Sequence, residues 1–275
     1  MSPAVRRPAP EPEDGPCSPQ QQQQDQQQQD QQQQDQQQQQ HRPQPAADKV
    51  PLPKLRLEVR DLAHPGAPLF LDSVNATRCL TTAIANLLRL LYTTPPAGPG
   101  SATVPPTRSV TLILRDMSGV AYTTGSDLDN DHKEIHFSLS YLEGIPAARA
   151  AREIAGVVTH ELVHCYQYDG FGTCPGGLIE GVADWVRLRC GLAPPHWVRD
   201  AAGSWDAGYQ KTAYFLDYLE GRFGNGLVRR VNEKLRVKKY DEAAFWTELT
   251  GASVDVLWKA YGESLKTTPG ANGGS

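Results

Sequence analysis

The stretch THELVHCYQYDG, residues 159–170, places two histidines four positions apart with a glutamate directly after the first. At 100° per residue, His160 and His164 lie one helical turn apart on the same face, where two imidazoles can bind one tetrahedral zinc ion. Glu161 is rotated off that line, so it can reach a water on the metal without being a ligand. The opposite side is an apolar stripe suited to a core, made of Ala155, Val158, Leu162 and Cys165. We therefore predict a helix with one buried face and one metal-binding face.

A second stretch, LIEGVADWVRL (178–188), carries Glu180 and Asp184 four positions apart. A catalytic zinc site needs a third protein ligand, and its histidines need acceptors for their other ring nitrogens. Glu180 as ligand and Asp184 as partner of a histidine, His160 for example, would meet both needs. Helix carboxylates are more often solvated charges, but the apolar neighbours of this pair indicate a buried helix. Asp169 and Cys174 remain alternative third ligands, whereas the metzincin pattern fails at Gln167 and Gly170.

In the rest of the domain, the patterns of apolar and polar residues predict mainly strands before residue 146 and helices after it. Alternating or apolar runs predict strands at 54–62, 109–116 (central) and 133–142, and a further one at 119–125. The polar face of 133–142 suggests a sheet edge or cleft wall, after a turn-like segment at 126–132. Helices are predicted at 71–92 (capped by Asp72 or Ser73), 146–168, 178–190, 208–223, 225–236, 241–249 and 253–265, with a loop at 93–107. This is an α+β domain with a small mixed sheet in its N-terminal half and a helical C-terminal half.

Residues 1–50 differ from the rest, because Gln20–Gln40 contains eighteen glutamines and three aspartates with nothing apolar to bury. We predict a disordered tail at 1–50, one domain at 51–266 and a loose C-terminal tail at 267–275. Residues 1–50 carry four basic and seven acidic side chains, and the remainder carries 23 against 24. This near-neutral domain gives no reason to expect nucleic acid or an anionic membrane as a partner. The oligomeric state is not predicted.

Cysteine usage and the N-terminus say little about location. The five cysteines are an odd number, and Cys174–Cys190 is one pairing that spacing allows. No apolar segment follows the two N-terminal arginines, so we predict no signal peptide and a cytoplasmic location by default.

The two stretches together resemble the basic secretory protein family of plants and fungi, a group of zinc peptidases. HELVHCYQYDG followed by PGGLIEGVADWVRLR carries the resemblance most strongly over 155–192. A wider similarity is to gluzincins, in which the glutamate and aspartate of the second helix correspond to Glu180 and Asp184. The resemblance implies a zincin-like fold and secretion. YQKTA, from Tyr209, resembles an aminopeptidase stretch whose tyrosine steadies the oxyanion, which makes Tyr209 a candidate catalytic residue and His136 a second choice.

The expected function is a zinc-dependent metallopeptidase that hydrolyses peptide bonds in peptide or protein substrates. One zinc ion held by His160, His164 and Glu180 would activate a water, and Glu161 would be the general base. The polar face of 133–142 could pair with an extended peptide. A catalytically silent binding module, stabilised by the metal, is the alternative, and a domain without metal is the third. Glu161 argues against the binding module, because a structural zinc site has no need of an acid beside its first histidine and closes with four protein ligands.

Overall fold

The apolar segment SVTLILR becomes the centre of a sheet. In the computed structural model, which describes residues 50–92 and 103–267, it forms strand β2 (Ser109–Arg115). Val110, Leu112 and Leu114 are fully buried, and Ile113 is 2% exposed on the opposite face. β2 pairs in parallel with β1 (Lys54–Val59) on one side and with β4 (Asp129–Ser138) on the other. The predicted central position of this strand is confirmed.

The sheet has the order β1-β2-β4-β3, and β3 (Ala121–Ser126) runs antiparallel to β4 at its edge. The sheet is therefore small and mixed, as predicted. Of the two places suggested for 133–142, a sheet edge or a cleft wall, the sheet edge is wrong, because β4 lies between β2 and β3. The turn predicted at 126–132 shrinks to residues 127–128, since backbone pairing with β3 extends β4 back to Asp129 despite its polar side chains.

β4 also ends earlier than its alternating pattern suggests. The Ser138 side chain accepts a hydrogen bond from the Tyr141 backbone N–H and caps a short helix, α4 (Leu139–Glu143). An N-cap serine offers the backbone this alternative to further strand pairing. Leu139 is buried within α4. The alternation of 133–142 thus spans a strand and a helix.

The helix predicted at 71–92 is two helices. α2 (Gly66–Ser73) ends at Val74, whose backbone is extended, and α3 (Ala76–Leu91) begins after Asn75. The Asn75 side chain accepts from the Arg78 N–H, so Asn75 and not Asp72 or Ser73 is the N-cap. The predicted apolar face of α3 holds, because Leu80, Ile84, Leu87 and Leu91 are buried.

The remaining helices follow the predicted ones closely. They are α5 (Ala147–His164), α6 (Gly176–Arg189), α7 (Tyr209–Phe223), α8 (Leu227–Val237), α9 (Glu242–Thr250) and α10 (Val254–Thr267). Only α5 is clearly shorter than predicted, since the chain leaves the helix at Cys165. The mixed α+β class is therefore confirmed.

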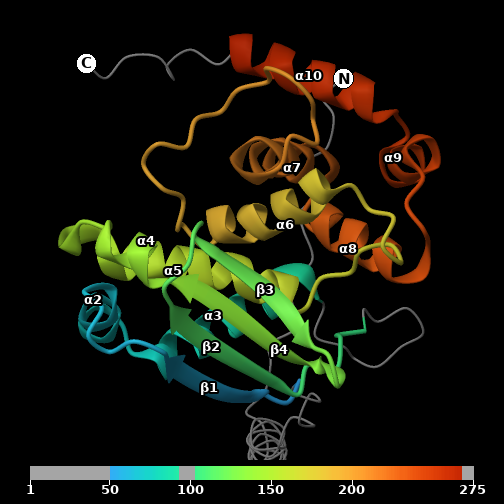
Figure 1. Ribbon diagram of the computed structural model, residues 1–275. Coiled ribbons are helices and arrows are strands. Elements are labelled where there is room, and N and C mark those ends of the chain that lie inside the picture. Colours follow the sequence, from blue (N-terminus) through green and yellow to red (C-terminus); the bar gives the residue numbers. More distant parts are fainter. Residues whose placement is uncertain (1–49, 93–102, 268–275) are drawn as a thin grey trace, which may run out of the picture. The chain divides into compact units, whose positions relative to one another are not determined.

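α5 is at the centre of the helix and sheet contacts. It packs against β3, α2, α3 and α6, and α7 packs on α6. Figure 1 shows the sheet on one side of α5 and the helices α6 to α10 on the other. From Glu153 onward, α5 is buried almost all round, including the polar residues His160 and Glu161.

Several predictions concern residues outside those described. The glutamine tract, most of the loop predicted at 93–107 and the C-terminal tail lie there, so the domain boundaries at 50/51 and 266/267 stay predictions. Cys79, Cys165, Cys174 and Cys190 carry free thiols, so the pairing of Cys174 with Cys190 is not formed. None of the helices in the described part of the chain has the length and apolar character that a membrane span needs.

Candidate metal centre and cleft

The C-terminal half of α5 brings the two histidines of the first stretch together. The Nε2 atoms of His160 and His164 lie 3.1 Å apart, with the rings edge to face. His160 is 8% exposed, and His164 is half-buried. Two imidazole nitrogens this close, one turn apart on a buried helix, face a common point.

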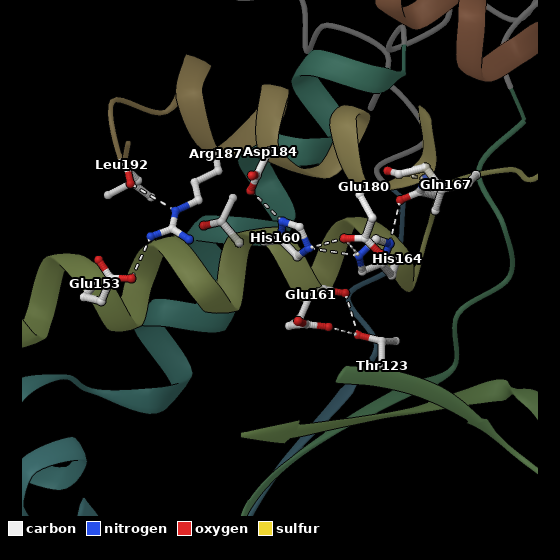
Figure 2. Close-up of polar contacts among 12 residues, drawn as sticks. Thr123, Glu153, His160, Glu161, His164, Gln167, Glu180, Asp184, Arg187 and Leu192 are labelled. Atoms are coloured by element: carbon white, nitrogen blue, oxygen red, sulfur yellow. Dashed lines mark hydrogen bonds and ion pairs between the residues drawn. The ribbon is translucent and has the colours of Figure 1, made fainter. Parts of the chain in front are cut away.

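Glu180 of α6 adds an oxygen to that point (Figure 2). Its Oε2 lies 3.1 Å from His160 Nε2 and 3.6 Å from His164 Nε2. In a tetrahedral zinc site with bonds near 2.05 Å, neighbouring ligand atoms are about 3.3 Å apart. The three observed separations bracket this value. In the described part of the chain this is the one group of histidine, cysteine or carboxylate side chains spaced to hold a metal ion.

The glycine-rich turn between α5 and α6 allows this approach. Gly170, Phe171 and Gly172 have left-handed backbones, which reverse the chain after α5. At the start of α6, a Cβ on Gly177 would lie 1.7 Å from the backbone oxygen of Asp206, so only glycine fits there. The alternative third ligands, Asp169 and Cys174, lie in or beside this turn and are not part of the group of donors.

The second nitrogen of each histidine is also engaged. His160 Nδ1 lies 2.7 Å from Asp184 Oδ1, and His164 Nδ1 lies 2.9 Å from Gln167 Oε1. Gln167 donates its Nε2–H to the backbone oxygen of Ile179, which fixes its amide so that Oε1 must accept from His164. Both Nδ1 atoms thus donate a proton to these partners, and the two Nε2 atoms are the nitrogens that would bind a metal.

The electrostatics of the metal-free cluster favour a cation. Burial alone would lower the pKa of His160, but hydrogen bonds to Asp184 and Glu180 outweigh it and raise the pKa to about 9. Burial likewise opposes ionisation of Glu180, yet the hydrogen bonds to His160 and His164 hold its pKa well below the usual range. His160 and Glu180 thus form an ion pair at neutral pH, and a metal ion would displace a proton from His160 on binding.

Glu161 lies beside the donors without joining them. It is 5% exposed, and its carboxylate faces β3, where the Thr123 hydroxyl lies 2.7 Å from Oε2 (Figure 2). Both Glu161 and the three donors line a cleft of about 1300 Å³. One wall of the cleft is the stretch 119–123, which leads into β3 and includes its first residues.

Tyr209 stands at the cleft as the first residue of α7. Its ring stacks on that of His160 at a centroid distance of 6.2 Å, and 58% of the residue is exposed. The negative charge of Glu180, with some burial, raises the pKa of its hydroxyl. Its φ of 48° is left-handed, which is uncommon for a residue with a side chain.

His136, the second choice for an oxyanion donor, is not in the cleft. It is 5% exposed, stacks on Tyr122 at 4.5 Å and contacts Glu134. The expectation that the polar face of 133–142 lines the cleft is also wrong, since its side chains, Glu134, His136, Ser138 and Ser140, are all absent from the lining. The cause is the topology: the wall next to α5 is the edge strand β3, not β4.

Comparison with known families now decides what the chain is related to. A family described as peptidases of plants and bacteria (BSP) matches residues 52–261, three quarters of the chain. The chain belongs to this BSP peptidase family. The matched range contains every residue of the cleft described above. No curated protein and no solved structure matches the chain.

Two residues of this BSP cleft escaped the sequence analysis, Thr123 and Gln167. Gln167 follows His164 by three positions, so asking which side chain accepts from the His164 Nδ1–H could have found it. Thr123 gives no such signal, because it lies on a strand 38 residues before Glu161.

Proposed function

We propose that this chain is a zinc-dependent peptidase with a zincin-like fold, in which His160, His164 and Glu180 hold one zinc ion. The observation that carries the proposal is the set of three donor atoms at 3.1, 3.1 and 3.6 Å, spaced as tetrahedral zinc requires. A bound zinc ion supplies Lewis acidity, which polarises a carbonyl and lowers the pKa of a bound water to about 7. Three protein ligands leave room for substrate, as catalytic sites do.

Glu161 suits the role of general base. It lies in the cleft directly after His160 but outside the donor set, so its carboxylate is free to take the proton of the attacking water. The same carboxyl group can then deliver that proton to the leaving nitrogen. A structural zinc site would have no use for such a carboxylate, and this favours the enzyme over a silent binding module.

The cleft suits an extended peptide. β3 is an edge strand, and its first residues, 121–123, lie in the cleft wall, where backbone groups can pair with a substrate strand. Tyr209, which also lines the cleft, is the donor that we assign to the oxyanion. A left-handed backbone at a non-glycine residue costs on the order of 1 kcal/mol or more and is typical of functional sites, which supports this assignment.

The test is cleavage of a random peptide library by the purified protein, with and without a chelator, mapped by mass spectrometry. We expect chelator-sensitive cleavage that returns on adding zinc. In Glu161→Gln, zinc should stay bound stoichiometrically while turnover falls by about 10²–10⁴, the usual contribution of a general base. Full activity in Glu161→Gln would remove that residue from the mechanism. Stoichiometric zinc without any cleavage by the wild-type protein would favour the metal-stabilised binding module.

A further inference from the structure

The carboxylate of Glu161 depends on a single side chain for its hydrogen bonding. Glu161 is 5% exposed, and a buried carboxylate is costly unless it accepts hydrogen bonds. Across residues 50–92 and 103–267, the one hydrogen bond recorded to its carboxylate is from Thr123 Oγ1, at 2.7 Å from Oε2. Glu161 Oε1 is left for the cleft.

The Thr123 hydroxyl lies within hydrogen-bond reach of two oxygens of Glu161. Besides Oε2, it lies 3.0 Å from the main-chain oxygen of Glu161. A hydroxyl has one proton, which can point to only one of these oxygens at a time. Pointed at Oε2 it holds the carboxylate, and pointed at the main-chain oxygen it holds the backbone of α5 at the same residue. Either hydrogen bond ties Glu161 to β3.

Thr123 is itself a rigid anchor. Its side chain is β-branched, which limits its rotamers, and its backbone lies in β3 opposite Ile135 of β4. β3 packs directly against α5. Little freedom is lost when such a residue forms a hydrogen bond, so the bond can fix a longer glutamate side chain at low entropic cost.

We propose that Thr123 is a positioning residue, which holds the Glu161 carboxylate in the cleft and couples it to the strand along which the substrate lies. The proposal rests on the proposed peptidase function for its kinetic consequence, but not for the contact itself. The hydroxyl, rather than the shape of the side chain, carries the role.

The kinetic experiment compares three variants of the full chain. Thr123→Val keeps the shape but lacks the hydroxyl, and we expect kcat to fall about 10- to 100-fold with KM changed less than about threefold. Thr123→Ser restores the hydroxyl and should retain kcat within about threefold. Thr124→Val is the matched control, because Thr124 is the exposed neighbour on β3 and its hydroxyl donates to the Gly125 backbone oxygen. It should behave as the wild type. Equal loss of kcat in Thr123→Ser and Thr123→Val would overturn the proposal.

A second measurement does not depend on activity. In the metal-free protein, Thr123→Val, Glu161→Ala and the double variant form a cycle on the free energy of unfolding, read by denaturant titration. The two single losses should sum to more than the loss in the double variant, since both break the same bond. Additive losses would overturn the proposal even if Thr123→Val folds poorly. If the wild type shows no chelator-sensitive cleavage, the proposed function fails, while the cycle still decides whether Thr123 holds Glu161.

Discussion

The two site histidines are held by unlike partners, Asp184 for His160 and Gln167 for His164. Asp184 is 3% exposed and ionisable, so it both orients His160 and helps raise its pKa. Gln167 is neutral and can only orient. Its own amide is fixed by the Ile179 backbone oxygen, which means that α6 determines the ring position of a histidine on α5.

We predict that Gln167→Leu weakens zinc binding by about 10- to 100-fold, because partners of this kind contribute that much to metal affinity. Leucine has a similar size but cannot accept from His164 Nδ1. The measurement is a competition titration with a zinc-binding dye. Gln210→Leu is the control, since the buried Oε1 of Gln210 has no hydrogen-bond partner in the described residues. Unchanged affinity in Gln167→Leu would mean that His164 needs no orienting acceptor.

At this scale the sequence predicted the residues that share a helix face. The spacing of His160 and His164, and of Glu180 and Asp184, fixes their relative directions once α5 and α6 form. Gln167 lies beyond the end of α5, and the contact that orients its amide, with the Ile179 backbone oxygen, comes from α6. Thr123 reaches Glu161 only through the packing of β3 on α5, which no local pattern encodes.

The contact between α6 and α7 determines where Tyr209 stands. Gly181 of α6 faces Thr212, which is fully buried in α7. The Thr212 hydroxyl accepts from the Gly208 N–H and donates to the Trp205 backbone oxygen, so it holds the loop that precedes Tyr209. The absence of a side chain at residue 181 is thus what lets α7 place its first residue at the cleft.

We predict that Gly181→Ala lowers the free energy of unfolding by about 1–3 kcal/mol, despite the better helix propensity of alanine. An added Cβ would lie 2.2 Å from Thr212 Cγ2 and 2.4 Å from its Cβ, so the helices must separate. Gly221→Ala is the matched control, because Gly221 lies inside α7 with nothing within 4 Å of an added Cβ. It should gain about 0.5–1 kcal/mol from helix propensity. Denaturant titration of both variants measures this free energy. An equal change in the two variants would contradict the close contact between Gly181 and Thr212.

Elements with strong periodicity were predictable to within a few residues, and α8 is an example. The errors arose where a cap competed with a periodic pattern. Asn75 divides one apolar run into α2 and α3, and Ser138 ends β4 and starts α4. Side-chain alternation also could not reveal that β4 is internal and β3 is the edge, because strand order depends on contacts between distant residues.

At the scale of the whole molecule, a buried ion pair joins three helices around one end of the cleft. Glu153 Oε1 of α5 accepts from Arg187 Nη2 of α6 and from the Tyr141 hydroxyl of α4, both at 2.9 Å. Arg187 also donates to the backbone oxygen of Leu192 (Figure 2). Burial would raise the pKa of Glu153, but the charge and hydrogen bond of Arg187, with help from Tyr141, outweigh it and lower the pKa.

The sign of the pH dependence follows from this lowered pKa. A glutamate in the unfolded chain has a pKa of about 4.3. Above that value Glu153 is ionised in both states and contributes its full stabilisation. As the pH falls below it, the unfolded state takes up a proton first, so the contribution shrinks and is lost once the pH passes the folded pKa.

We predict that Glu153→Gln lowers the free energy of unfolding by about 3 kcal/mol near neutral pH. The difference in this free energy between variant and wild type should narrow below about pH 4.3. Urea titrations at pH 7, 5, 4 and 3 measure it. Glu58→Gln is the control, because the Glu58–Arg60 pair is exposed and should contribute less than about 1 kcal/mol at any of these pH values. A difference for Glu153→Gln that stays constant from pH 7 to pH 3 would show that the charge of this carboxylate does not stabilise the fold.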